Sequence, residues 1–263
     1  KGSSPTKIAF FAVIGTSHSL RHQINYRNNK ILRQPFTSHP RNILTMSGGT
    51  NDKSKALPNI PELCVFDLDA CLWDQEMYEM RAMPTDKIIG DLNGRGKGVL
   101  GVMSGGDKIS LHKGSIMALQ AHADGVYPGM KIAFASSADT PFAEKVGRAS
   151  LKMLEVLPGL SVWDLTMRDW DNVDVNQIGR QPPLSSNKAK SHFPFLKEAT
   201  KIRYDRMLFF DDCNWGDHCG MVSAACKEED TGKGVVAVRT PRGLKEEEFN
   251  RGMLLYSNQY STI

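Results

Sequence analysis

Two aspartates stand directly after one of the most apolar segments of the sequence. Residues 63–66 are Leu, Cys, Val and Phe, and Asp67 and Asp69 follow with one leucine between them. Such a run is typical of a buried strand in a parallel sheet, and open α/β sheets bind ligands beyond the carboxyl ends of their strands. Two like charges this close cost free energy unless a cation or a proton neutralises one. The pair therefore predicts a metal site, an acid/base pair, or both, against the plainer alternative of an acidic turn.

Two further strand ends carry polar side chains. The apolar residues 206–210 run directly into Asp211 and Asp212, and the predicted strand at residues 131–135 runs into Ser136 and Ser137. A helix is predicted soon after the serines, so hydroxyl and backbone N–H groups could together bind an anion there. The alternative is that both serines are ordinary loop and cap residues.

Two lysines complete the set of candidate site residues. Lys188 and Lys190 precede a short amphipathic helix predicted at residues 191–200. Clustered carboxylates favour Mg²⁺, which is usually held by one or two carboxylates together with phosphate oxygens. A carboxylate could then attack the phosphorus, a lysine and a serine could offset charge on the phosphate, and a second carboxylate could move protons.

The alternation of strands and helices predicts an α/β fold, a three-layer Rossmann-like parallel sheet with helices on both faces. Further strands are expected at residues 160–165 and 235–238, and two helices are expected to begin at Thr140-Pro141 and at Thr240-Pro241, the first of them ending at Pro158. The Gly-rich residues 90–98 predict a hairpin or flap in place of a large cap. Residues 166–187 read as an irregular surface insertion whose acidic residues form a solvated face.

These residues, in this order, resemble the four motifs of the haloacid dehalogenase superfamily of phosphatases, over roughly residues 60–240. The segments around Asp67, Ser136, His192 and Asp211 are most similar to the small magnesium-dependent phosphatases of acid phosphatase type. The resemblance implies a phosphatase that forms an aspartyl phosphate, needs Mg²⁺, has a minimal cap, and acts on phosphotyrosine-type or sugar-phosphate-type substrates.

The resemblance also implies a role for each motif. Asp67 is expected to be the nucleophile and a metal ligand. Asp69 is expected to be the general acid/base and to offer its backbone carbonyl to the metal. The phosphate is expected to contact Ser136, Ser137 and either Lys188 or Lys190, with Lys188 slightly preferred, while Asp211 or Asp212 completes the metal shell. Cys71 departs from the pattern, because threonine is usual there and a hydroxyl contact is lost.

The first 56 residues differ in composition from the rest of the chain. Residues 1–51 contain no Asp or Glu but seven Lys or Arg residues. They are expected to be a targeting presequence, or else a disordered extension, and the phosphatase domain is expected to span residues 57–263. A cytoplasmic or organellar location follows, and five cysteines without a metal-binding spacing fit reduced thiols.

The expected partner is a phosphorylated small molecule or a phosphoprotein, with no nucleic acid, no membrane and a monomeric state. Three other functions fit parts of the pattern. A catalytically silent member of the same fold would act as a binding protein. A phospho-receiver module also uses strand-end aspartates and a lysine, but it lacks an acid at the place of Asp69. A glycosyltransferase with an Asp-x-Asp metal site leaves Asp211 and Asp212 unexplained.

Overall fold

The computed structural model describes residues 57–171 and 173–259. The predicted presequence at residues 1–56 lies outside the described residues. Within the described part of the chain, no helix is both long and apolar enough to cross a membrane.

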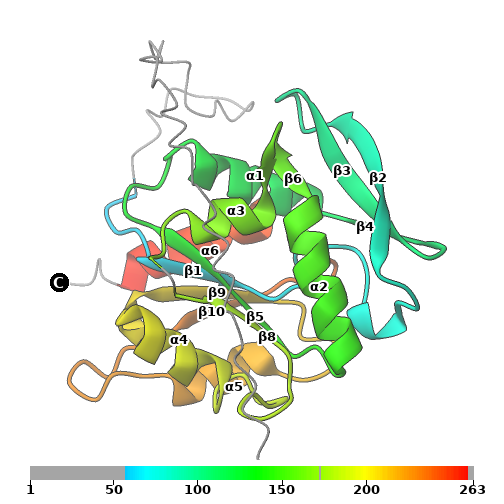
Figure 1. Cartoon of the computed structure of the whole chain (residues 1–263). Coiled ribbons are helices and arrows are strands. Elements are labelled where there is room, and N and C mark those ends of the chain that lie inside the picture. Colours follow the sequence, from blue (N-terminus) through cyan, green and yellow to red (C-terminus); the bar gives the residue numbers. More distant parts are fainter. Residues whose placement is uncertain (1–56, 172, 260–263) are drawn as a thin grey trace, which may run out of the picture. The chain divides into compact units, whose positions relative to one another are not determined.

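A five-stranded parallel sheet forms the centre of the fold (Figure 1). Its strands, in spatial order, are β10 (Val236–Arg239), β9 (Met207–Asp211), β1 (Leu63–Phe66), β5 (Lys131–Ser136) and β8 (Asn176–Ile178). All four residues of β1 are buried, which agrees with its position between two neighbouring strands. The predicted α/β class and parallel sheet are confirmed.

Helices cover both faces of this sheet, and the strand residues alternate between the two layers (Figure 1). Cys64 and Phe66 pack in one core with helices α1 (Lys113–Ala123), α2 (Pro141–Met153), α3 (Val162–Met167) and α6 (Glu246–Gln259). Leu63 and Val65 pack in the other core, with α4 (His192–Thr200) and α5 (His218–Ala225). The period of two along a strand therefore divides one apolar run between two cores.

The flap is a small antiparallel sheet between β1 and α1. It comprises β2 (Pro84–Asp91), β3 (Lys97–Ser104) and β4 (Asp107–Ser110), and the 3₁₀ helix η1 (Met77–Glu79) precedes it. Gly90 pairs with Gly98 across the hairpin, and Asn93 and Gly94 form its turn with positive φ angles of 57° and 76°. The predicted hairpin at residues 90–98 is confirmed.

The strand predicted at residues 160–165 is confirmed only over Leu160–Ser161 and is wrong from Val162 onward, where α3 begins. α2 ends at Met153, before Pro158, and a short hairpin of β6 (Glu155–Leu157) and β7 (Leu160–Ser161) follows it. The chain then turns into α3, because Ser161 Oγ accepts a hydrogen bond from the backbone N–H of Asp164 and caps the helix. The β-branched and aromatic residues after Ser161 favoured a strand, and the cap outweighs that preference.

The prediction of an irregular insertion at residues 166–187 is also wrong over β8, which is an edge strand of the central sheet. Asn176–Ile178 pair with Phe134–Ser136 of β5 in parallel. Two of the acidic residues nearby have polar partners: Asp169 Oδ2 lies 3.0 Å from Nε2 of the buried His122, and Asp174 Oδ2 forms an ion pair with Arg148, at 3.1 Å. Within the residues that the structure describes, neither belongs to a cluster of acidic side chains that could hold a metal ion.

The last helix begins later than predicted. Thr240 and Pro241 do not cap it, because α6 starts at Glu246, where the backbone N–H of Lys245 donates to Glu248 Oε2. The Thr240 hydroxyl instead donates to the thiol of Cys71, at 3.3 Å. All five cysteines are buried and carry free thiols.

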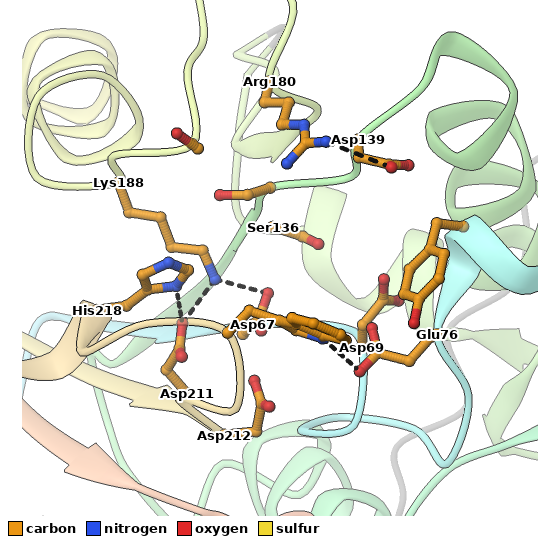
Figure 2. Close-up of a pocket in the computed structure, with 14 residues that line it drawn as sticks. Asp67, Asp69, Glu76, Ser136, Asp139, Arg180, Lys188, Asp211, Asp212 and His218 are labelled. Atoms are coloured by element: carbon orange, nitrogen blue, oxygen red, sulfur yellow. Dashed lines mark hydrogen bonds and ion pairs between the residues drawn. The ribbon is translucent and has the colours of Figure 1, made fainter.

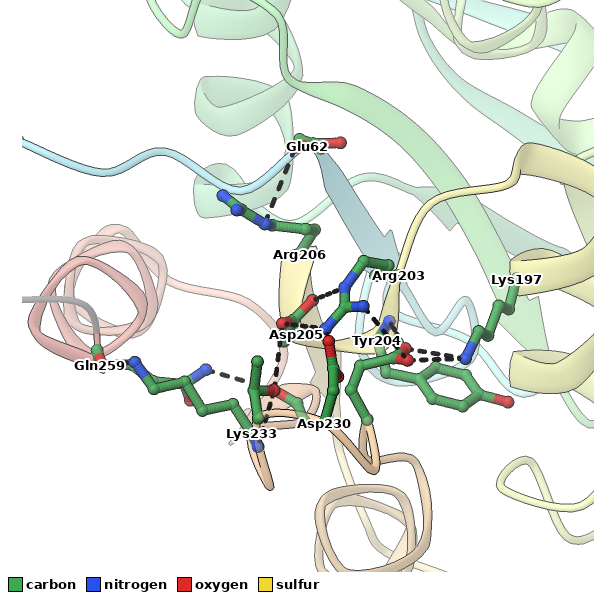
Figure 3. Close-up of polar contacts among 12 residues, drawn as sticks. Glu62, Lys197, Arg203, Tyr204, Asp205, Arg206, Asp230, Lys233 and Gln259 are labelled. Carbon is green, nitrogen blue, oxygen red and sulfur yellow. Dashed lines mark hydrogen bonds and ion pairs between the residues drawn. The ribbon is translucent and has the colours of Figure 1, made fainter.

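A network of ion pairs holds the amino end of β9 (Figure 3). Arg203 contacts both Asp205 and Asp230, at 3.0 and 2.7 Å, and Glu228 lies 2.8 Å from Lys197 of α4. The backbone N–H of Tyr204 also donates to Glu228. The contacts fasten the entry of β9 to α4 and to the loop before β10, at the opposite end of the strand from Asp211.

Candidate active site

The two acidic strand ends lie side by side. β1 and β9 are neighbours with Phe66 opposite Phe210, so Asp67 and Asp211 emerge at the same edge of the sheet. The backbone N–H of Asp67 donates to the carbonyl of Phe210, at 2.9 Å, which extends the pairing by one step. Ser136 ends β5, on the other side of β1. The sheet therefore brings the three predicted strand ends, with Asp67, Ser136 and Asp211, together at one edge.

Tight turns hold the carboxylates at this edge. The chain takes the left-handed conformation at Ala70 (φ 50°) and at Cys213 (φ 56°), shortly after each acidic pair. Asp211 Oδ1 accepts from the backbone N–H of Cys213, and Asp212 Oδ2 accepts from that of Asn214. These side chain-to-backbone bonds orient both carboxylates.

Three of the predicted carboxylates form a cluster. Asp67, Asp211 and Asp212 are buried, and each offers an oxygen within 4.8 Å of the others. Buried carboxylates repel one another unless a cation is present, and their oxygens are the ligands that hard divalent cations prefer. The cluster therefore fits a metal ion.

The side chain of Asp69 lies outside this cluster. Its Oδ1 accepts from the indole N–H of Trp73 and its Oδ2 from the backbone N–H of Met77, both at 3.0 Å. Burial, and next the charge of Asp67, raise the pKa of Asp69 well above the usual value. A carboxyl group with a raised pKa can hold a proton near neutral pH and donate it. The metal role predicted for its backbone carbonyl stays a prediction.

Figure 2 shows that Lys188 enters the cluster. The Lys188 side chain is 1% exposed, and its Nζ lies 2.8 Å from Asp67 Oδ1 and 2.6 Å from Asp211 Oδ2. Lys190 is exposed and is not among the residues that line the cavity. Of the two predicted lysines, only Lys188 has the position for contact with a ligand at this edge.

The carboxylates around Lys188 have unequal proton affinities. Burial raises the pKa of Asp67 to about 7, against the opposing effect of Lys188. Burial also acts against the charge of Asp211, but Lys188 and His218 together hold its pKa below the usual value. Burial and the charge of Asp211 raise the pKa of Asp212. Without a further cation the cluster holds more negative charge than Lys188 can offset.

The two serines lie at the wall of the same cavity. Ser136 is buried, and its carbonyl accepts hydrogen bonds from the His192 ring at 3.1 Å and from the backbone N–H of Gly179 at 2.8 Å. The Ser137 hydroxyl is shielded from solvent and has no hydrogen-bond partner within the described residues. Thr140 caps α2, as predicted, by accepting from the N–H of Ala143. This turn offers a free hydroxyl to an anion.

A cavity of about 420 Å³ contains these residues. Figure 2 shows the ion pair between Arg180 and Asp139, at 3.3 Å, on one side, and His218 beside Asp211, at 3.3 Å, on another. Sequence reasoning did not identify several lining residues, namely Glu76, Tyr78, Asp139, Arg180, Ser186, Trp215 and His218. For His218 a signal existed, because it opens the helix that Asp217 caps.

Comparison with known proteins found a family model and a solved structure that match this chain. A model of the acid phosphatase family matches residues 59–259. One similar solved structure is the N-terminal part of the protein BF1531 from Bacteroides fragilis, described as containing a phosphatase domain complexed with Mg. The identity is 16% and the TM-score 0.40, and the match covers 76% of this chain and 40% of that chain. A search of curated proteins found no match.

Proposed function

The chain belongs to the acid phosphatase family, and on this premise we propose that its cavity hydrolyses phosphate monoesters through an aspartyl-phosphate intermediate and with Mg²⁺. The observation that carries the proposal is the contact of one buried lysine, Lys188, with Asp67 and Asp211 beside the third carboxylate, Asp212. Such an arrangement serves poorly as a structural feature, because it buries more negative than positive charge.

The donor set fits magnesium. Asp67, Asp211 and Asp212 supply hard oxygen ligands at close range, and Mg²⁺ in proteins is commonly held by a few carboxylates, substrate phosphate and water. When bound, the ion supplies a positive charge that stabilises the phosphate oxygens as charge develops on them. The excess negative charge of the cluster supports a divalent cation.

Asp67 is the proposed nucleophile. Its carboxylate oxygen forms a bond to phosphorus while the bond from phosphorus to the leaving oxygen breaks, which gives an aspartyl phosphate and an alcohol. Lys188 favours the ionised form of Asp67 by direct contact, against the effect of burial, and then offsets charge on the transferred phosphoryl group. The hydroxyls of Ser136 and Ser137 donate to the same oxygens.

Asp69 moves the protons. In its protonated state it gives a proton to the leaving oxygen, and as a carboxylate it then takes one from the water that attacks the aspartyl phosphate. The N–H groups of Trp73 and Met77 hold its two oxygens in place for both steps. This second step regenerates Asp67 and releases inorganic phosphate.

The substrate is proposed to be of the phosphotyrosine type or the sugar-phosphate type. The site lies at the edge of the sheet in a cavity of about 420 Å³, which leaves room for a substrate larger than phosphate itself. The test is hydrolysis of p-nitrophenyl phosphate by the full chain, with Mg²⁺ and with a chelator, beside Asp67→Asn. Metal-dependent turnover that the variant lacks would support the proposal. Near-normal activity of Asp67→Asn would exclude this nucleophile.

A further inference from the structure

Two exposed aromatic side chains line the cavity and have no part in the proposed chemistry. Tyr78 of η1 is 44% exposed, and Trp215, in the loop between β9 and α5, is 75% exposed. Their ring centroids lie 6.1 Å apart with the planes at 83°. The indole N–H of Trp215 donates to Glu76 Oε1 at 3.2 Å, which holds the tryptophan in place. We call Tyr78, Trp215 and Glu76 the aromatic corner.

The aromatic corner lies on the side where the leaving group departs. Met77, between Glu76 and Tyr78 in sequence, donates its backbone N–H to Asp69, the proposed donor of a proton to the leaving oxygen. Figure 2 shows Glu76 next to Asp69, while Lys188 approaches Asp67 from the opposite side. A phosphate held by Lys188 therefore directs the rest of the substrate toward the aromatic corner.

This wall of the cavity carries a surplus of negative charge. Asp139 is paired with Arg180, but Glu76 forms no ion pair within the described residues, its partner there being the uncharged indole of Trp215. In addition, Asp139 Oδ1 is shielded from solvent and has no hydrogen-bond partner in the described part of the chain. Two carboxylates thus face one guanidinium around the space left for the leaving group.

We propose that the aromatic corner binds a positively charged ammonium group on the leaving alcohol. Tyr78 and Trp215 lie edge to face, and the exposed face of an aromatic ring attracts a cation through its negative π surface. The Glu76 carboxylate adds a direct charge. A neutral alcohol would gain the ring contacts but leave the carboxylates unbalanced. The inference rests on the proposed function and narrows its substrates to phosphate monoesters of amino alcohols or amino sugars.

The experiment compares substrates that differ only in this charge. The kcat/KM of the full chain with Mg²⁺ is measured for phosphocholine and its uncharged carbon analogue 3,3-dimethylbutyl phosphate, and for glucosamine 6-phosphate and glucose 6-phosphate. We expect a preference of about 3- to 30-fold for the charged member of at least one pair. The pair that shows it distinguishes an amino alcohol from an amino sugar. No preference in either pair would overturn the inference.

Three variants assign the preference to the aromatic corner. Trp215→Leu removes one ring, and Glu76→Gln removes the charge while it keeps an oxygen for the indole N–H. Both are expected to lose most of the preference, whereas Phe195→Leu, which alters an exposed aromatic residue of α4 away from the cavity, should retain it. A preference that survives in both corner variants would contradict the inference.

Hydrolysis of p-nitrophenyl phosphate distinguishes a failure of this inference from a failure of the proposed function. Turnover of this ester, with no preference for the charged substrates, would refute only the proposal that the aromatic corner binds an ammonium group. A folded chain that hydrolyses none of the esters would refute the proposed function, and this inference with it.

Discussion

The ammonium group of Lys188 lies 2.8 Å from the carboxylate of Asp67, although both side chains are shielded from solvent. Asp211, on the neighbouring strand, contacts the same ammonium group. Removing one partner of a buried ion pair leaves an uncompensated charge and is strongly destabilising. Lys188 therefore has a structural task in the free protein and a binding task when phosphate is present.

Replacing this lysine should affect both stability and turnover. Lys188→Met keeps most of the length of the side chain but leaves Asp67 and Asp211 without their shared cation. We expect a loss of about 3 kcal/mol in the free energy of unfolding, measured by urea denaturation, together with loss of phosphatase activity. Lys190→Met is the matched control, because Lys190 is exposed and does not line the cavity. An inactive Lys190→Met with an active Lys188→Met would reverse the assignment.

Replacing Asp69 should slow hydrolysis most for phosphate esters that have poor leaving groups. Asp69→Asn cannot donate a proton, so hydrolysis of an alkyl phosphate is expected to fall by about 10²- to 10⁴-fold. p-Nitrophenolate needs little help from an acid, so its departure should be slowed much less in single-turnover measurements. Equal losses for both esters would show that Asp69 acts in some other way.

Weakening the carboxylate cluster should alter the metal requirement. Asp212→Asn removes one negative ligand, and we expect the Mg²⁺ concentration for half-maximal activity to rise about tenfold or more. A chelator should abolish activity of the unmodified chain, and added Mg²⁺ should restore it. Asp174→Asn serves as control, because that surface aspartate pairs with Arg148. An unchanged metal titration for Asp212→Asn would exclude this residue as a ligand.

The buried histidine His192 should make the fold sensitive to acid. Burial, with Lys188 nearby, lowers its pKa from 6.5 to about 4. The unfolded chain therefore binds a proton between these values that the folded chain does not, so the stabilisation is complete above about pH 6.5 and is lost as the pH falls toward 4. Urea denaturation between pH 4 and 7 should show a steeper loss for the unmodified chain than for His192→Gln. Parallel curves would contradict this.

The parts of the site that lie on buried strands could be predicted from sequence. β1 and β9 are continuous apolar runs because both faces of the sheet are covered, and their ends place Asp67 and Asp211 together. β8 could not be predicted in this way, because Asn176 and Gln177 have no preference for a strand. These residues form a strand only because they pair with β5.

The rest of the cavity wall depends on the paths of irregular segments. Glu76 lies just before η1, and Arg180 lies in the segment after β8. Trp215 lies in the loop after β9, and all three side chains line the cavity. No periodic pattern fixes the course of such segments, since tertiary contacts decide it. For the same reason the sequence does not decide between Lys188 and Lys190 as the phosphate-binding residue. The turn before α4 determines which lysine points inward, and this is Lys188.

The order of strands also has a consequence for biosynthesis. β1, near the start of the described chain, has β5 on one side and β9, from its last third, on the other. Pairing between segments so distant in sequence makes folding slow, because a long loop must close before the contact forms. On a ribosome the strand that bears Asp67 emerges before β9 and can pair with β5 first. Assembly of the carboxylate cluster is therefore expected to follow the pairing of β1 with β5, because it must wait until β9 has been made.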